Sequence, residues 1–209
     1  MMYYVTTMLW RLIMAPRLRI KVSGKENIPT KGPFIVVSRH TSIYDPWIII
    51  DALNFGKRPI RWLAGLGLYS IEISARKFAR GKSRPIAFCV GFAVSFIVKY
   101  SLTIPVEREE DGGKRFSTVN KHAFKTIRTI LTSSDGVVGI FPEGGINREG
   151  NIHSSFINIA QMYNVPILPV RIEGKEVVFG KAIMPDKNLV GHERIVEAHK
   201  IIGRTYKKM

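Results

Sequence analysis

Residues 34–45 read Phe-Ile-Val-Val-Ser-Arg-His-Thr-Ser-Ile-Tyr-Asp, and this stretch decides the expected fold. Phe34 to Ser38 has the apolar composition of a strand in a sheet that is covered on both faces. A helical pattern follows from about Tyr44 to Asn54. His40 and Asp45 therefore bracket a strand-to-helix turn at the carboxyl end of a buried strand, where open α/β sheets place their active sites.

Strands and helices alternate along the rest of the chain. Apolar or alternating runs predict the strands, and apolar residues at helical spacing predict the helices between them. This alternation indicates an α/β fold with a mostly parallel or mixed central sheet flanked by helices. The predicted strands are residues 17–22, 34–38, 59–64, 102–106, 137–141, 165–172 and 177–179, and the predicted helices are residues 3–14, 44–54, 116–131, 156–163 and 193–206.

His40 and Asp45 are the residue types of a general base and its orienting group. A single turn can bring the Asp45 carboxylate onto one nitrogen of the His40 imidazole. That contact fixes the tautomer and leaves the other nitrogen free to accept a proton. The same two residues also suit a structural hydrogen bond or a helix cap, so the pair by itself leaves both interpretations open.

Two further polar segments follow predicted strands. The segment Phe141 to Gly145 reads Phe-Pro-Glu-Gly-Gly, in which the paired glycines let a ligand approach the backbone and Glu143 is a candidate polar anchor. The predicted strand 102–106 ends just before Arg108, whose planar guanidinium suits a phosphate. The plainer alternatives are a glycine-rich turn and a solvated surface arginine.

Several familiar signatures are missing from the sequence. It has no Gly-x-Ser-x-Gly elbow, P-loop or His-Glu-x-x-His motif, which weakens the hydrolase, NTPase and zinc-protease alternatives. Gly65-Leu66-Gly67 lacks the third glycine of a dinucleotide fingerprint. The single Cys89 excludes an internal disulfide framework and a cluster of thiolate zinc ligands, and it suits a reducing compartment.

The charge of the chain predicts polyanionic partners. Its 209 residues carry a formal net charge of +16, with a pI near 10.2, which favours nucleic acid, an anionic membrane or an acidic carrier protein. Zinc-knuckle, RNA-recognition and helix-turn-helix patterns are missing, so we do not expect nucleic acid as the partner. A basic nucleic-acid-binding module and a non-catalytic lipid-binding protein remain the alternatives to an enzyme.

Four sequence blocks follow one another in a defined order. They are His40-x4-Asp45, the strand before Arg108, Phe141 to Gly144, and Val165 to Val170, which reads Val-Pro-Ile-Leu-Pro-Val. Over residues 24–174 this order resembles the glycerolipid acyltransferase family, typified by 1-acylglycerol-3-phosphate acyltransferase. The resemblance implies transfer of a fatty acyl group from acyl-CoA or acyl-carrier protein to a lysophospholipid. The first expected acceptor is 1-acylglycerol-3-phosphate (lysophosphatidic acid), which would give phosphatidic acid, with no cofactor and no metal.

The resemblance also implies a role for each site residue. His40 would take the proton from the acceptor hydroxyl, with Asp45 orienting its ring. The hydroxyl would then attack the thioester directly, without an acyl-enzyme intermediate. The substrate-binding residues would be Glu143, Gly144 and Gly145 around the acceptor, with Arg108 on its phosphate.

The sequence departs from the family pattern at three places. Arg39 stands where the family usually has Asn or His. Ile146 stands where a phosphate-binding arginine is expected, and Arg148 is the nearest candidate to replace it. Asn158 lies in a segment without the usual Lys and Gly. These departures affect the phosphate site more than acyl transfer, so they leave the acceptor lipid open.

Two regions are candidates for contact with a membrane. Residues 1–16 are expected to form an N-terminal membrane-interface helix ahead of an acyltransferase domain of residues 17–209. The apolar run 86–98 is too short to span a bilayer and reads as a buried core helix or an interfacial one. Basic residues within 17–21 and 76–84 would contact anionic headgroups. We therefore expect a peripheral or monotopic protein of the cell membrane with its active site facing the cytoplasm. An acidic acyl-carrier protein is a further candidate partner.

Overall fold

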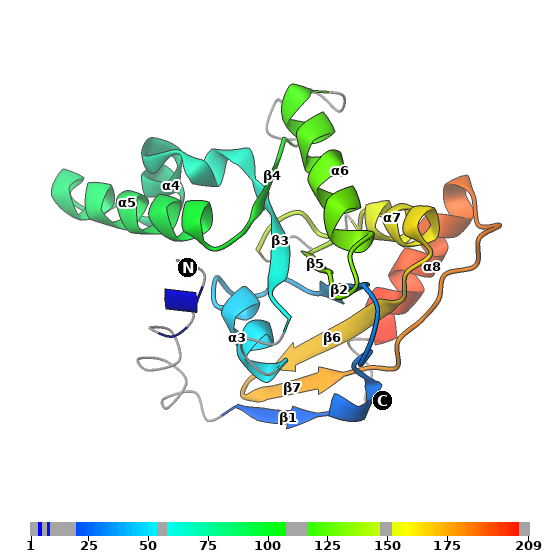
Figure 1. The fold of residues 1–209 in the computed structure, drawn as a ribbon. Coiled ribbons are helices and arrows are strands. Elements are labelled where there is room, and N and C mark those ends of the chain that lie inside the picture. The colour runs from blue at the N-terminus through cyan, green and yellow to red at the C-terminus, as the bar shows by residue number, and fades with distance from the viewer. Residues whose placement is uncertain are drawn as a thin grey trace. The chain divides into compact units, whose positions relative to one another are not determined.

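The structure is a computed structural model that describes residues 4–5, 8, 20–53, 58–107, 117–146 and 152–204. The chain divides into two compact units, one of Met1–Met8 and Arg61–Thr126 and the other of Leu9–Ile60 and Ile127–Met209. Strands and helices alternate within both (Figure 1). The predicted α/β class is therefore confirmed.

The second unit contains a mixed sheet with the strand order β1-β7-β6-β2-β5. Strand β2 lies between β5 and β6 and is parallel to both, whereas β6 and β7 are antiparallel and β1 runs parallel to β7. Every residue of β2 and β5 is buried, as their apolar runs predict. The strands are β1 (Lys21–Ser23), β2 (Phe34–Ser38), β5 (Val137–Ile140), β6 (Ile167–Glu173) and β7 (Glu176–Phe179).

Helices of the same unit cover this sheet. Helix α3 (Asp45–Ala52) contacts β7, α7 (Ser155–Tyr163) contacts β2, and α8 (Gly191–Arg204) contacts β6 and lies beside α7 (Figure 1). A short 3-10 turn, η1 (Lys25–Asn27), precedes β2. The helices contribute Ile49, Phe156 and Ile201 to the core, and all three are fully buried. Apolar cover of this kind explains why every residue of β2 and β5 is buried.

Arg58 fixes the amino ends of β2 and β5. Its guanidinium donates hydrogen bonds to the carbonyls of Pro29 (2.7 Å), Gly32 and Asp135 (3.3 Å). The same group lies 4.6 Å from the centre of the Phe34 ring. Because these partners stand just before the two strands, the contacts hold the strands in register and so set where their carboxyl ends fall.

The first unit contains a parallel strand pair and a pair of packed helices. Strand β3 (Ile60–Gly65), whose first residue belongs to the second unit, pairs with β4 (Ile104–Val106). The turn η2 (Leu66–Tyr69) leads into α4 (Ile71–Phe78), which lies beside α5 (Arg84–Tyr100) (Figure 1). Only Gly91 and Ser95 of α5 are buried, so the interpretation of run 86–98 as a buried core helix is wrong. Helix α6 (Thr118–Leu131), whose last residues belong to the second unit, follows as predicted.

The N-terminal helix is described at three positions only. Tyr4, Val5 and Met8 are helical and exposed. The rest of the predicted helix, together with Arg17 and Arg19, lies outside the described residues. Within the described part of the chain, no helix has both the length and the apolar character needed to cross a bilayer.

Candidate active site

The candidate site lies at one edge of the sheet in the second unit. Strands β2 and β5 are parallel neighbours, with Val37 paired to Ile140, so their carboxyl ends meet at the same edge. His40 follows the end of β2 by two residues, and Glu143 follows the end of β5 by three. These two segments, which each follow a buried strand in the sequence, therefore converge at one edge of the sheet in the structure.

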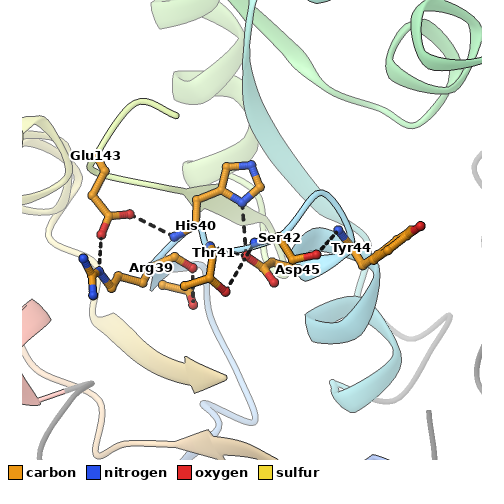
Figure 2. A network of polar contacts seen from close by, with 8 residues as sticks. Arg39, His40, Thr41, Ser42, Tyr44, Asp45 and Glu143 are labelled. Carbon is orange, nitrogen blue, oxygen red and sulfur yellow. Dashed lines mark hydrogen bonds and ion pairs between the residues drawn. The ribbon is translucent and has the colours of Figure 1, made fainter. Parts of the chain in front are cut away.

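The turn after β2 brings Asp45 onto the His40 ring (Figure 2). Oδ2 of Asp45 lies 3.2 Å from Nδ1 of His40. The same oxygen accepts hydrogen bonds from the backbone N–H groups of Thr41 (2.7 Å) and Ser42 (2.8 Å). Asp45 is the first residue of α3, where the helix dipole favours a negative charge. The local sequence thus folds the turn around this carboxylate, whose side chain is only 1% exposed.

Glu143 holds the other side of the turn. Its Oε2 accepts a hydrogen bond from the backbone N–H of His40 at 2.9 Å, and its Oε1 lies 2.7 Å from Nε of Arg39 (Figure 2). The two contacts join segments that are more than 100 residues apart in the sequence. Glu143 therefore fixes the backbone that carries the imidazole.

Phe141 supports the ring itself. The His40 and Phe141 rings stack with their centres 4.1 Å apart and their planes 16° apart. With Nδ1 turned to Asp45, Nε2 is the remaining ring nitrogen, and no described residue is hydrogen-bonded to it. The side chain is 17% exposed, so the arrangement offers an oriented imidazole with one nitrogen open to a ligand.

Burial raises the pKa of Glu143 above its ordinary value of 4.5, against the lowering effects of the His40 N–H and the Arg39 guanidinium. A group whose pKa is higher in the folded than in the unfolded protein stabilises the fold below the unfolded pKa. That stabilisation is lost as the pH rises through the folded pKa. The stability that Glu143 contributes is therefore lost over a pH range that begins near 4.5 and extends upward.

We expect Glu143→Gln to remove this pH dependence. Gln keeps an acceptor for the His40 N–H but does not ionise, so the melting temperature of the wild type should fall relative to that of the variant as the pH rises from 4.5. Thermal unfolding of both proteins across the acidic range checks it. The raised pKa of Glu143 is contradicted if the difference between the two melting temperatures is constant with pH or changes in the opposite direction.

The other predicted site residues are described only in part. Gly144 has a φ of 67°, the left-handed conformation that the glycine-rich turn predicts, and its N–H donates to the Phe141 carbonyl. Gly145 and Ile146 continue this turn and are half-buried. Arg108 and Arg148 lie outside the described residues. In the first unit, the Asn120 side chain bonds both backbone groups of Glu107, directly before Arg108.

Some contributors to the site are missing from the sequence-based prediction. The stacking of Phe141 and the backbone donors of Thr41 and Ser42 were not predicted. The sequence marks Arg39 only as a departure from the family pattern and gives no indication that it pairs with Glu143. A signal for Phe141 was available, because the last apolar residue before the Pro-Glu-Gly turn must lie near the same sheet edge as His40.

Comparison with known proteins points to one family. A family model described as Acyltransferase matches residues 19–173. The chain is 27% identical over 165 residues to the 1-acyl-sn-glycerol-3-phosphate acyltransferase of Bacillus subtilis, covering 78% of this chain and 67% of that protein. The crystal structure of the 1-acyl-sn-glycerophosphate (LPA) acyltransferase of Thermotoga maritima is similar with a TM-score of 0.56 at 18% identity, over 96% of this chain and 77% of that one. At that identity the structural likeness concerns the fold.

Proposed function

The chain belongs to the acyltransferase family, whose model matches residues 19–173, and on that premise we propose that it acylates a lysophospholipid from an acyl thioester. The proposed acceptor is 1-acylglycerol-3-phosphate, the substrate named for the Bacillus subtilis relative, and the product is phosphatidic acid. The observation that carries the proposal is the His40 ring, which is held at Nδ1 by Asp45 and open at Nε2.

In the proposed mechanism, Nε2 of His40 takes the proton of the acceptor hydroxyl as its oxygen attacks the thioester carbonyl carbon. The Asp45 carboxylate stabilises the imidazolium that forms. The tetrahedral intermediate then collapses with cleavage of the carbon–sulfur bond, and the leaving thiolate recovers the proton from His40. The products are an ester and a free thiol, so the step balances. A thioester is already activated, and one positioned base is therefore sufficient for this chemistry.

The parts around His40 have supporting roles in this mechanism. Glu143 and Phe141 keep the imidazole in place through the backbone N–H and the ring face. The backbone around Gly144 and Gly145 is proposed to border the acceptor. Arg108, and Arg148 in place of the arginine missing at Ile146, are proposed to bind the acceptor phosphate.

A product analysis tests the substrate assignment. The purified chain is given labelled acyl-CoA or acyl-carrier protein with a panel of lysophospholipids that differ in headgroup, and the products are identified by mass. We expect phosphatidic acid to be the main product. A different phospholipid as the main product overturns the proposed acceptor, and the absence of any ester product overturns the proposed activity.

Arg108→Ala should raise the KM for the acceptor by about tenfold or more while leaving the KM for the acyl donor within about twofold. A charge-assisted hydrogen bond to a phosphate is worth about 1.5–3 kcal/mol, which corresponds to a change of that size. Initial rates with each substrate varied in turn measure both constants. Arg128, which is exposed on α6, provides the control substitution Arg128→Ala. An effect confined to the donor contradicts the proposed role.

Anionic membrane lipid is the proposed environment of this reaction. The acceptor and the product both have fatty acyl chains, so they reside in a membrane, and the charge of +16 favours an anionic one. We propose a cell-membrane location with the site facing the cytoplasm. Acyl-CoA and acidic acyl-carrier protein are both compatible donors.

A further inference from the structure

Helix α5 exposes an apolar face that the proposed chemistry does not use. The exposed large side chains are Ile86 (52%), Phe88 (60%), Phe92 (51%), Phe96 (38%), Ile97 (38%) and Tyr100 (39%). Phe88, Phe92, Phe96 and Tyr100 follow one another every four residues, so they form one row along the helix. Contiguous exposed apolar patches mark protein or membrane contacts.

The face covers about half of the helix circumference, at roughly 100° per residue. Cys89 and Ala93 are exposed beside the aromatic row and continue the apolar face. The exposed charged residues of α5 are Arg84 at its first turn and Lys99 at its last. An apolar face bounded by basic residues is the arrangement of a helix that lies in a membrane interface.

The opposite face of α5 is fixed to the rest of its own unit. A Cβ on Gly91 would lie 2.3 Å from the Ile71 carbonyl oxygen and 2.8 Å from the Ala75 Cβ, so α4 and α5 are in close contact at this point. Ser95 donates a hydrogen bond of 2.6 Å to the Tyr69 carbonyl. Rotation of α5 to bury its aromatic row would break these contacts. The outward orientation is therefore built into the packing.

The positive charge around this face indicates which kind of partner it binds. Residues 71–100 contain six basic residues and one acidic residue. That acidic residue, Glu72, forms an ion pair with Arg76, and both line an open groove beside α4 together with Arg80 and three alanines. A second copy of the chain would bring the same positive charges together, whereas an anionic lipid surface would neutralise them. Tyr4, Val5 and Met8, which belong to the same unit, are also exposed.

We propose that the outward face of α5 docks the protein on an anionic lipid surface. Phe88, Phe92 and Phe96 enter the boundary between headgroups and acyl chains, and Arg84 and Lys99 contact lipid phosphates at the two ends of the helix. This inference deepens the proposed function, because it names the surface that brings the enzyme to a membrane-resident acceptor. It also assigns the run 86–98 to the membrane interface, the second of the two interpretations that its sequence allows.

The test uses the single cysteine of the chain as the reporter. Cys89 is exposed within the face, so the full chain is labelled there with an environment-sensitive fluorophore and mixed with vesicles of phosphatidylcholine, with or without phosphatidylglycerol. Neither acyl donor nor acceptor is present. We expect a blue shift and a rise in emission with the phosphatidylglycerol vesicles, both reduced by added salt.

A matched pair of variants measures the contribution of the face. Phe92 and Phe124 are each 51% exposed, but Phe124 lies on α6. Phe92→Ser with Phe96→Ser should lower partitioning onto phosphatidylglycerol vesicles by about tenfold or more, and Phe124→Ser should change it by less than about twofold. Unaltered circular dichroism shows that both proteins remain folded. Cosedimentation gives the partition coefficients.

Three outcomes overturn the proposal. One is that Phe92→Ser with Phe96→Ser binds vesicles as strongly as the wild type does, and that the fluorophore on Cys89 of the wild type shows no change in emission with vesicles. Another is a concentration-dependent dimer, seen without lipid, that Phe92→Ser and Phe96→Ser abolish. The third is an emission change produced by acyl-carrier protein alone. His40→Ala should bind vesicles as the wild type does, so a failure of the proposed acyl transfer is distinguishable from a failure of this inference.

Discussion

His40→Ala is expected to lower the rate of acyl transfer by about a hundredfold to ten-thousandfold, the range over which a positioned general base contributes. Nε2 of His40 carries the proposed proton transfer, and the alanine variant has no group to replace it. The loss should appear in kcat, because the substitution removes a function needed in the transition state and no contact to the resting acceptor. Initial rates of ester formation from labelled acyl thioester measure it.

The control for this variant is the loss of an imidazole elsewhere. His122 is exposed on α6, and His122→Ala should keep the activity of the wild type. Thermal unfolding of His40→Ala measures how much stability is lost with the stack on Phe141, so that a loss of folded protein is not mistaken for a loss of catalysis. A folded His40→Ala protein with wild-type kcat removes His40 from the mechanism.

Asp45→Asn is expected to have the second-largest effect, a loss of about a hundredfold or more in kcat with a small change in the acceptor KM. One oxygen of Asp45 makes the contacts to Nδ1 of His40 and to the N–H groups of Thr41 and Ser42. If the asparagine places its oxygen there, the imidazolium loses its countercharge. If it places its NH2 there, that group faces two other donors and is repelled. Both orientations weaken His40 as a base.

Asp186→Asn is the matched control for this substitution. Asp186 is exposed, and its carboxylate accepts a local hydrogen bond from the Asn188 N–H, so its variant should retain full activity. Comparison of kcat and KM for the two variants separates a positioning role of Asp45 from a general loss of stability. An Asp45→Asn protein with only the acceptor KM raised assigns Asp45 to acceptor binding and contradicts the mechanism.

The sheet edge that carries the site could be predicted from the sequence. Phe34 to Ser38 and Val137 to Ile140 are apolar on both faces, which occurs when a strand is covered on both sides. Parallel strands of this kind bring their following residues to one edge. For this reason the approach of His40 to Asp45, and of both to the turn at Glu143, followed from local patterns.

The environment of Glu143 could not be predicted in the same way. Its oxygens are occupied by Arg39 and by the backbone of His40, which are contacts between segments distant in the sequence. A local pattern identifies a polar residue at a sheet edge, but the direction of its side chain depends on the tertiary packing. The sequence therefore predicts a polar anchor at Glu143, and the structure shows which groups this side chain contacts, the Arg39 guanidinium and the backbone N–H of His40.

The buried face of α5 could not be predicted from local sequence patterns either. Its sequence is apolar around most of the helix, so periodicity alone gives no direction for the buried face. The face is decided by the two small residues Gly91 and Ser95, which allow the close approach of α4 and the bond to Tyr69. Composition therefore predicted an apolar helix, and packing determined which side remained exposed.

The tautomer of His40 tests the central claim most directly. The chain has five histidines, and in a sample with 15N-labelled histidine the resonances of His40 are those that disappear in His40→Ala. In the neutral ring, the account predicts a proton on Nδ1 and none on Nε2. It also predicts that Asp45→Asn disturbs this preference. A His40 ring that carries its proton on Nε2 in the wild-type protein has no free nitrogen facing the acceptor, and that result contradicts the mechanism.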